Sequence, residues 1–358
     1  MKKLIGIFIV TAFALTGCNN QQQQMETSDN NPVQADPKHE FVKLDEFLRK
    51  FDEPSQTFKE PTNKLIKVKG KQGTIIYINP SDLEAENGQP LGKDVEIELK
   101  ELSNQQQLLR ANAQTVSDGQ LLVSGGACFI NVTSAGQKVK LKEGKTYSVV
   151  FPKLSDDEMS LFYGQRDSTE KMNWKEADQK FVIEKSATDS SHTYETLIVM
   201  GKDTTRQTTN VNISEEERQK LLRDYKVSGR IYSPVELNQF GWINCDRFFK
   251  KGEIKTTLQF EITNKVEDVN YARVTLIFKD IKSIMQSGYY FYDGKIEGNT
   301  FENIPVGMKI KFLAVSYQHE KVFATLINEM QVKENHIEKI SLQEMSEKEF
   351  DLLMKSIQ

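Results

Sequence analysis

Residues Asn238 to Phe249, NQFGWINCDRFF, combine side-chain types that an enzyme or a binding site would use. Cys245 carries a thiol that could act as a nucleophile, and Asn244 or Asp246 could orient a histidine base. The chain has four histidines, and His319 lies in the same half of the sequence as this stretch. A hydrolase that uses Cys245 is therefore one hypothesis for these residues.

A β-strand gives the same stretch a structural interpretation. Side chains alternate between the two faces of a strand, so Ile243, Cys245 and Phe249 would share one face while Trp242 and Phe248 would share the other. An apolar environment raises the pKa of a thiol and makes it inert. We therefore predict that Cys245 is a structural residue and expect no catalytic residue in the chain.

Two charged residues of this stretch, Asp246 and Arg247, would point to opposite faces of the strand. We expect each of them to find its partners on other segments.

The other cysteine beyond residue 18 is Cys128. We expect Cys128 and Cys245 to be buried free thiols that pack as small apolar side chains, with a disulfide between two domains as the alternative.

Aromatic side chains also gather at a second place. Tyr289, Tyr290 and Tyr292 precede Asp293-Gly294, a pair typical of a hairpin turn. Aromatic rings at a hairpin tip could stack on a sugar, so these tyrosines, together with Trp242, are candidate binding residues of a glycan-binding module. Packing in the core is the alternative for the same rings.

Motifs for other chemistry are missing from the sequence. There is no phosphate-binding loop, and Ser124-Gly125-Gly126 lacks the glycine that a nucleophile elbow needs two positions before its serine. There is no CxxC or HxxxH pair, so we expect no cofactor and no transition-metal site. The acidic segments 156–158 and 267–268 could bind calcium, although solvated loops are the alternative.

The first residues, MKKLIGIFIVTAFALTGC, indicate export. A basic start precedes an apolar run that is short for a membrane-spanning helix, as in a secretory signal. Leu15-Thr16-Gly17-Cys18 resembles the lipobox of bacterial lipoproteins. The resemblance implies that residues 1–17 are removed and that Cys18 carries a diacylglycerol and an acyl chain. Three acyl chains exceed the two lipid signals that stable anchoring takes.

The net charge of the processed chain and the residue after Cys18 indicate which partners and which membrane to expect. Removing residues 1–17 removes Lys2 and Lys3, leaving 45 basic against 51 acidic residues. This acidic balance argues against nucleic acid as a partner. Asn19 favours the outer membrane, because the rule for enteric lipoproteins associates aspartate there with the inner membrane. We expect the bilayer and an envelope protein or glycan as partners.

Composition and periodicity divide the chain further. Residues 18–40 are polar and read as a flexible tether. Residues 41–200 start with a short amphipathic helix that ends at Pro54 and continue with short strands. Residues 201–225 read as a linker with a short helix behind a capping box at 214–217. Residues 226–358 form a C-terminal β-domain that closes with a second capped helix at Ser346.

Alternating apolar residues predict the strands, as in Val95, Ile97 and Leu99, and glycine-containing turns separate them. This spacing predicts a mainly β fold: two antiparallel β-sandwich-like domains with short peripheral helices, after the signal peptide and the tether.

The order GKQGTIIYI, VEIELKE, TVSDGQLLVSGGACFINVT, YSVVFP and MSLFYG resembles the ZU-five module, a β-sandwich of ankyrins, netrin receptors and zonula occludens proteins. Residues 60–176 are closest to the version in uncharacterised exported bacterial lipoproteins, and the second half with GWINCDRF resembles the same proteins. The resemblance implies an interaction or scaffold module without catalytic residues. We therefore expect a non-enzymatic lipoprotein of the cell envelope.

Overall fold

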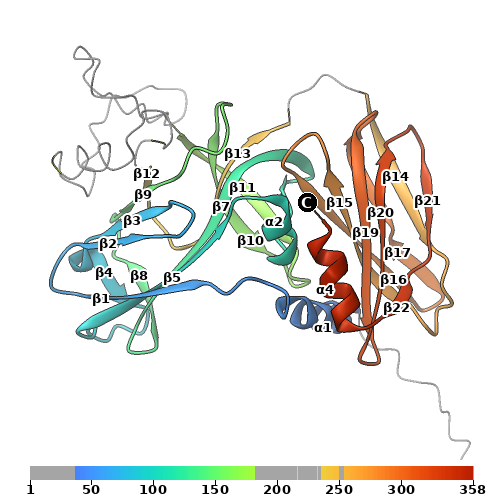
Figure 1. Ribbon diagram of the computed structural model, residues 1–358. Helices are drawn as coiled ribbons and strands as arrows, with labels where there is room; N and C mark the ends of the chain where they lie inside the picture. The colour runs from blue at the N-terminus through green and yellow to red at the C-terminus, as the bar shows by residue number, and fades with distance from the viewer. Residues whose placement is uncertain (1–36, 182–215, 217–231, 233–234, 250–253, 358) are drawn as a thin grey trace, which may run out of the picture. The chain divides into compact units, whose positions relative to one another are not determined.

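Four β-sheets and three α-helices make up the part of the chain that the computed structural model describes, residues 37–181, 216, 232, 235–249 and 254–357 (Figure 1). The sheets form two sandwiches, and the predicted mainly β class with antiparallel sheets and few short helices is confirmed. One strand pair, β14 with β21, is parallel.

The first sandwich packs a nine-stranded sheet on a four-stranded sheet. The main path of the large sheet is β1 (Gln56–Pro61), β5 (Asp94–Leu102), β7 (Gln120–Ser134), β13 (Gly241–Phe248), β10 (Ser160–Arg166) and β11 (Met172–Lys180). Three short strands branch from it, namely β4 (Leu83–Ala85), β6 (Val116–Ser117) and β8 (Gln137–Leu141). The smaller sheet has the order β12 (Val235–Leu237), β9 (Tyr147–Val150), β3 (Ile75–Ile78) and β2 (Ile66–Lys69). A 3-10 helix, Pro80–Asp82, precedes β4.

Alternation along β5 explains how this sandwich closes. Val95, Ile97 and Leu99 are buried, as predicted, and they pack with side chains of the smaller sheet such as Ile76 and Val149. The other face of β5 carries Glu98 and Lys100, which are only half-buried. The large sheet therefore has one apolar face inside the sandwich and a second face that is free to meet other elements.

The second sandwich packs a three-stranded sheet on a six-stranded sheet. The small sheet has the order β18 (Thr300–Pro305), β14 (Lys255–Ile262) and β21 (Ile337–Ile340). The larger one has the order β17 (Lys295–Gly298), β16 (Ile284–Tyr292), β15 (Tyr271–Phe278), β19 (Lys309–Gln318), β20 (Lys321–Gln331) and β22 (Gln343–Met345). Phe260, Phe301 and Phe312 meet in its core. Every residue of β15 is buried, because both faces of this strand are covered.

The three helices α1 (Pro37–Arg49), α2 (Gln105–Arg110) and α4 (Glu347–Lys355) lie between the two sandwiches (Figure 1). They share a third apolar core with the outer faces of the two large sheets, to which Phe47, Trp174, Leu313 and Phe350 contribute. Backbone hydrogen bonds also join the sandwiches, from Thr115 N–H to the Ile284 carbonyl oxygen at 2.8 Å among others.

The helix α1 is the amphipathic helix that the spacing of Leu44 and Phe47 predicts. Both side chains are buried. The Phe47 ring stacks on Tyr317 with the ring centres 4.4 Å apart and the planes at 12°. The apolar stripe of α1 therefore packs on the C-terminal sandwich, although the sequence places this helix with the N-terminal β-domain. The expected tether, 18–40, also overlaps the first turn of α1.

The capping box of α4 is confirmed. The Ser346 hydroxyl oxygen accepts a hydrogen bond from the Glu349 backbone N–H, while the Glu349 carboxylate accepts one from the Ser346 N–H. The predicted apolar face of this helix, including Phe350 and Met354, is buried. Ser214 and Glu217, which define the other predicted capping box, lie outside the described residues, as does most of the expected linker, 201–225.

The strands β12 and β13 belong to the first sandwich, although both follow residue 226, where the C-terminal domain was expected to begin. The sequence assigns them to the C-terminal β-domain, but β13 pairs with β7 and β10, and β12 pairs with β9. Both strands therefore complete the first sandwich. The apolar pattern of a strand shows that it needs a sheet but not which sheet, because pairing depends on contacts far away in the sequence. Among the described residues, no helix has the length and apolar character to cross a bilayer.

Candidate functional site

A pocket of about 450 Å³ opens between α1, the end of α2 and the outer face of the nine-stranded sheet. Its volume falls within the range of about 300–1,000 Å³ that is typical of small-molecule sites. Aromatic, cationic and acidic side chains line it together: Asp45, Leu48, Arg49, Asp52, Ser55, Glu98, Lys100, Arg110, Ala111, Asn112, Phe129, Arg166, Glu170 and Trp242. We call it the Trp242 pocket.

Strand register builds the floor of the Trp242 pocket. Lys100 on β5 lies opposite Phe129 on β7, and Phe129 lies opposite Trp242 on β13. Directly paired residues of neighbouring strands project to the same face of a sheet. The Phe129 and Trp242 rings are 5.1 Å apart between centres, with their planes at 48°. Both side chains are half-buried, so they form an aromatic floor beneath the opening.

The next position in this row is Gly164 on β10, which lies opposite Trp242 on one side and Trp174 on the other. A β-carbon at Gly164 would lie 2.7 Å from the Trp174 ring, 2.7 Å from Trp242 Cβ and 2.8 Å from Met172 Sδ. Only glycine therefore lets the two tryptophan rings meet edge to face, with centres 6.5 Å apart. Trp174 is itself fixed, because its Nε1–H donates to the Gln114 carbonyl oxygen at 2.6 Å.

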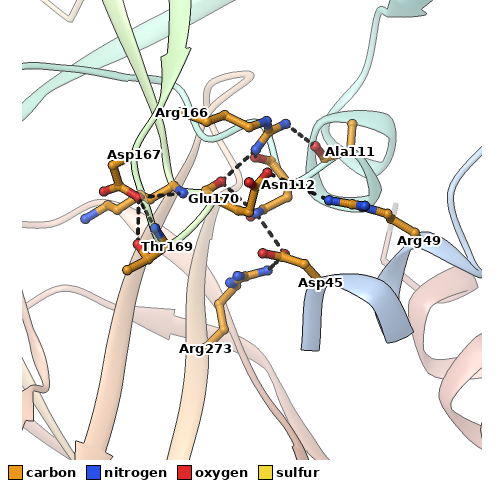
Figure 2. A network of polar contacts seen from close by, with 10 residues as sticks. Asp45, Arg49, Ala111, Asn112, Arg166, Asp167, Thr169, Glu170 and Arg273 are labelled. Carbon is orange, nitrogen blue, oxygen red and sulfur yellow. Dashed lines mark hydrogen bonds and ion pairs between the residues drawn. The ribbon is translucent and has the colours of Figure 1, made fainter. Parts of the chain in front are cut away.

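The Arg166 side chain holds Trp242 from another direction. Its guanidinium carbon lies 5.2 Å from the centre of the Trp242 ring, a cation–π distance. Figure 2 shows the same guanidinium between the end of α2 and the turn from β10 to β11, where it donates to the carbonyl oxygens of Ala111, Asn112 and Glu170 at 2.7–2.8 Å. Burial lowers the pKa of Arg166, but an arginine remains charged in proteins.

A buried ion pair attaches α1 to this framework. Arg273 on β15 donates to the Asp45 carboxylate at 2.5 Å, and the Asn112 amide donates to the same oxygen at 3.0 Å (Figure 2). The side chains of Asp45 and Arg273 are only 5% and 9% exposed. Asn112 also donates to the Glu170 carbonyl oxygen at 3.0 Å. Asp45 therefore joins the second sandwich, through α1, to the polar network beside Trp242.

The charged residues at the mouth of the pocket differ in how far they are already engaged. Lys100 donates to the Asp52 carboxylate at 2.5 Å and to the Glu53 carbonyl oxygen at 2.7 Å. Arg49 and Glu170 approach only to 3.8 Å. Within the described part of the chain, neither the Glu98 carboxylate nor the Arg110 guanidinium forms a hydrogen bond or an ion pair. Arg110 Nε is moreover buried without a partner there, which costs about 1–3 kcal/mol.

The stretch around Cys245 is a strand, and its facing is as predicted except for Phe249, which follows the end of β13 and packs against the core of the second sandwich. Ile243 and Cys245 lie in the core of the first sandwich, while Trp242 and Phe248 pack on the opposite side of the sheet. Cys128 and Cys245 are both free and buried, as predicted. Burial raises the pKa of the Cys245 thiol well above its ordinary value, and the nearby Asp246 carboxylate raises it further.

Two polar residues of β13 are fully buried beside this thiol. The Asn244 amide donates to the Asp246 carboxylate at 2.6 Å, so this partner of Asp246 lies on the same strand and not on another segment. Burial raises the pKa of Asp246 to about 7. Arg247 finds its partner in another segment, as expected, and donates through Nε to the Asp157 carboxylate at 2.8 Å.

The described histidines lie elsewhere. His39 is exposed on α1, and His319 is exposed at the turn between β19 and β20. His336 Nε2 lies 2.7 Å from the Glu338 carboxylate. None of these rings hydrogen-bonds to the Cys245 thiol, so the hypothetical pair of Cys245 with His319 is not assembled here. The same part of the chain contains no cluster of three metal-ligating side chains.

The structure separates the aromatic candidates of the sequence. Trp242 lies in the floor of the pocket. Tyr289 is only 3% exposed and belongs to the core of the second sandwich, so its ring is not free to stack on a ligand. The Tyr290 hydroxyl donates to Glu297 at 2.6 Å, and its ring packs against Phe41. Tyr292 is 44% exposed at the end of β16, away from the residues that line the Trp242 pocket.

Sequence reasoning missed the residues that surround Trp242. Phe129 is a large apolar residue in a strand row that continues with the polar Asn131 and Thr133, which was a usable signal. Glu98 fits the polar row of β5, and Arg166 and Arg110 carry no signal either, because their roles depend on which strands and helices become neighbours. Cys18, the expected site of lipid attachment, lies outside the described residues.

Comparisons with known proteins give no indication of the function of this chain. No protein-family model matches the chain. No curated protein matches it either. The resemblances to the ZU-five module and to exported lipoproteins therefore stay predictions, and the Trp242 pocket is the feature from which a function has to be argued.

Proposed function

We propose that the chain is a non-enzymatic binding protein of the cell envelope, held at a membrane by acyl chains on Cys18, and that the Trp242 pocket is its binding site. One observation carries the binding role. The Trp242 ring is immobilised by Phe129, Trp174 and Arg166, yet it still lines an open pocket. A fixed aromatic surface loses little conformational freedom when a ligand binds, which favours affinity.

The nature of the thiols supports binding rather than catalysis. A cysteine nucleophile has to be accessible and needs a lowered pKa or an adjacent base. Cys245 is only 1% exposed, and burial raises its pKa. The described part of the Trp242 pocket is lined by arginine, lysine and carboxylate side chains around aromatic rings, a composition that suits recognition.

The sequence supports the anchor. The basic start, the apolar run and Leu15-Thr16-Gly17-Cys18 agree in order and length with the signal of an exported lipoprotein. In this proposal, the protein belongs to the outer membrane where the cell has one. The polar residues that follow Cys18 separate the acyl chains from α1, whose apolar face is already packed against protein.

Metabolic labelling with palmitate tests the anchor. The wild-type chain should carry the label and sediment with membranes, while Cys18→Ala should lose both properties. Label that still migrates with Cys18→Ala would contradict the lipid attachment.

Thermal unfolding in the presence of envelope material tests the binding role. Envelopes of the producing cell are separated into saccharide, peptide and lipid fractions, and each is added to the soluble chain that starts at residue 19. We expect one fraction to raise the Tm of the wild type but not of Trp242→Ala. Tyr292→Ala is the matched aromatic control, because this ring lies outside the pocket. If no fraction raises the Tm, or if Trp242→Ala responds as the wild type does, the proposed binding site is wrong.

A further inference from the structure

We infer that the Trp242 pocket binds a neutral saccharide, with one sugar ring stacked on Trp242 and Phe129. The inference rests on the proposed binding function and specifies the chemical class of its ligand. Three features of the pocket lead to it: the aromatic floor, the polar groups that remain free at its wall, and the balance of charge around it.

The aromatic floor favours a ligand with a flat apolar face. Trp242 and Phe129 lie side by side in one row of the sheet, with ring centres 5.1 Å apart. Trp174 and Arg166 keep Trp242 from turning. A pyranose ring presents C–H groups on its faces and hydroxyls around its edge, so it can cover an aromatic face while its edge stays polar. An acyl chain offers the apolar contact without a polar edge, and a tyrosine or tryptophan side chain carries one polar group where a sugar carries several.

Two side chains of the lining, Glu98 and Arg110, need a ligand that can both donate and accept hydrogen bonds. Within the described residues, the Glu98 carboxylate accepts no hydrogen bond and the Arg110 guanidinium donates none, although both line the pocket. A carboxylate only accepts and a guanidinium only donates, whereas a hydroxyl does both. The hydroxyls at the edge of one sugar can therefore donate to the carboxylate and accept from the guanidinium. Ser55 adds a third hydrogen-bonding side chain to the lining.

The balance of charge points to a neutral ligand. The lining contains four cations, Arg49, Lys100, Arg110 and Arg166, and four carboxylates, Asp45, Asp52, Glu98 and Glu170. The strongest donors are already engaged, because Arg166 is held by three carbonyl oxygens and Lys100 by Asp52. Recognition of a phosphate or carboxylate requires several free donors that converge. Arg110 and the loosely paired Arg49 face Glu98 and Glu170 in the same pocket and do not supply that arrangement.

The size of the pocket suits a short saccharide or the end of a longer one. Its volume of about 450 Å³ lies in the lower half of the usual range for small-molecule sites. The wall opposite the sheet is α1 with the residues that follow it, and Lys100 holds this segment through Asp52 and the Glu53 carbonyl oxygen. The ligand would therefore lie between the sheet and the first helix of the described chain.

Titration with defined oligosaccharides tests the inference. Tryptophan emission reports on the site directly, because the chain has two tryptophans and both lie at or beside the pocket floor. Neutral oligomers of glucose, mannose, galactose and N-acetylglucosamine are compared with oligouronates, with inorganic phosphate and with short peptides. We expect one neutral oligomer to change the emission of the wild type with a Kd that hardly varies with salt concentration.

Variants separate this site from any other. Glu98→Gln keeps the shape of the side chain and removes its charge, so the Kd should rise on the order of tenfold. Trp242→Ala should abolish binding in calorimetry. Tyr292→Ala should bind as the wild type does. Because Trp242→Ala could disturb the sheet, circular dichroism and the Tm of each variant are measured first, and Glu98→Gln decides if Trp242→Ala does not fold.

Each other outcome overturns the inference in a recognisable way. Preference for an oligouronate or phosphate, with affinity that falls as salt is added, would replace the neutral saccharide by an anion. Binding of the peptide or lipid fraction alone would leave the proposed binding function intact but exclude a saccharide. Binding of a neutral oligomer that Glu98→Gln and Trp242→Ala leave unchanged would place the saccharide at another site.

Discussion

The Asp45 carboxylate on α1 and the Arg273 guanidinium on β15 form a buried ion pair at 2.5 Å, although 228 positions separate them in the sequence. This pair holds the first described helix to the second sandwich and places the side of α1 that faces the Trp242 pocket. The pocket is therefore not a property of one sandwich alone. Its floor belongs to the first sandwich, while one wall is held in place by the second.

The ion pair gives a first prediction. Asp45→Ala leaves the Arg273 guanidinium buried without its partner, so the free energy of unfolding should fall by about 3–5 kcal/mol. Urea unfolding of the soluble chain measures this change. Glu347→Ala is the matched control, because it removes the exposed ion pair between Lys50 and Glu347 and should hardly change stability. Equal effects of the two substitutions would contradict the structural role of the Asp45–Arg273 pair.

The contact of the two tryptophans gives a second prediction. Gly164→Ala would insert a methyl group where the Trp174 ring and Trp242 Cβ leave no room. We expect a loss of about 1–3 kcal/mol in the free energy of unfolding, as for other overpacked cores, together with a shift of tryptophan emission. Gln165→Ala changes the exposed neighbour on the same strand and serves as the control. Normal stability and emission of Gly164→Ala would mean that the two rings do not meet as described.

Asp246 gives a prediction about pH. Burial raises its pKa to about 7 in the folded chain, against about 3.9 in the unfolded chain. Between pH 4 and pH 7, the carboxyl of Asp246 keeps its proton in the folded state and has lost it in the unfolded state. The contribution of this residue to the free energy of unfolding is therefore fully present below pH 4 and decreases as the pH rises to 7. Between pH 5 and pH 8 this residue should contribute a loss of about 2–3 kcal/mol.

The comparison of wild type with Asp246→Asn isolates that contribution, because all other titrating groups are shared. The difference in free energy of unfolding between the two proteins, measured by urea unfolding from pH 5 to pH 8, should shift in favour of the variant as the pH rises. A difference that stays constant over this range would show that Asp246 titrates at an ordinary pKa.

The thiols give the fourth prediction. Cys128 and Cys245 are each 1% exposed, and burial raises the pKa of both. In the soluble chain that starts at residue 19, these are the two cysteines present. A maleimide should therefore react slowly in the native state and rapidly after unfolding in denaturant. Rapid native labelling at neutral pH would revive the hydrolase hypothesis for Cys245.

The sequence by itself determined what depends on neighbours along the chain. Alternation of Val95, Ile97 and Leu99 was enough to orient β5, because side chains of a strand have a period of two. The capping box at Ser346 was readable, because it joins residues three positions apart. The facing of Trp242 and Cys245 on β13 and the burial of the thiol followed from the same alternation. The expected lipid attachment at Cys18 likewise rests on contiguous residues.

Only the tertiary structure decided what depends on distant contacts. The pairing of β13 with β7 and β10 brings Trp242 beside Phe129 and Trp174, and no local pattern encodes that choice. The burial of Tyr289 and the exposure of Tyr292 depend on which sheet covers their strand. Asp45 and Arg273 meet because two sandwiches and a helix pack together, and such contacts arise from the sum of many weak apolar interactions over the whole chain. The strands and helices named here could therefore be predicted from the sequence, whereas the Trp242 pocket that they enclose forms only when the chain folds.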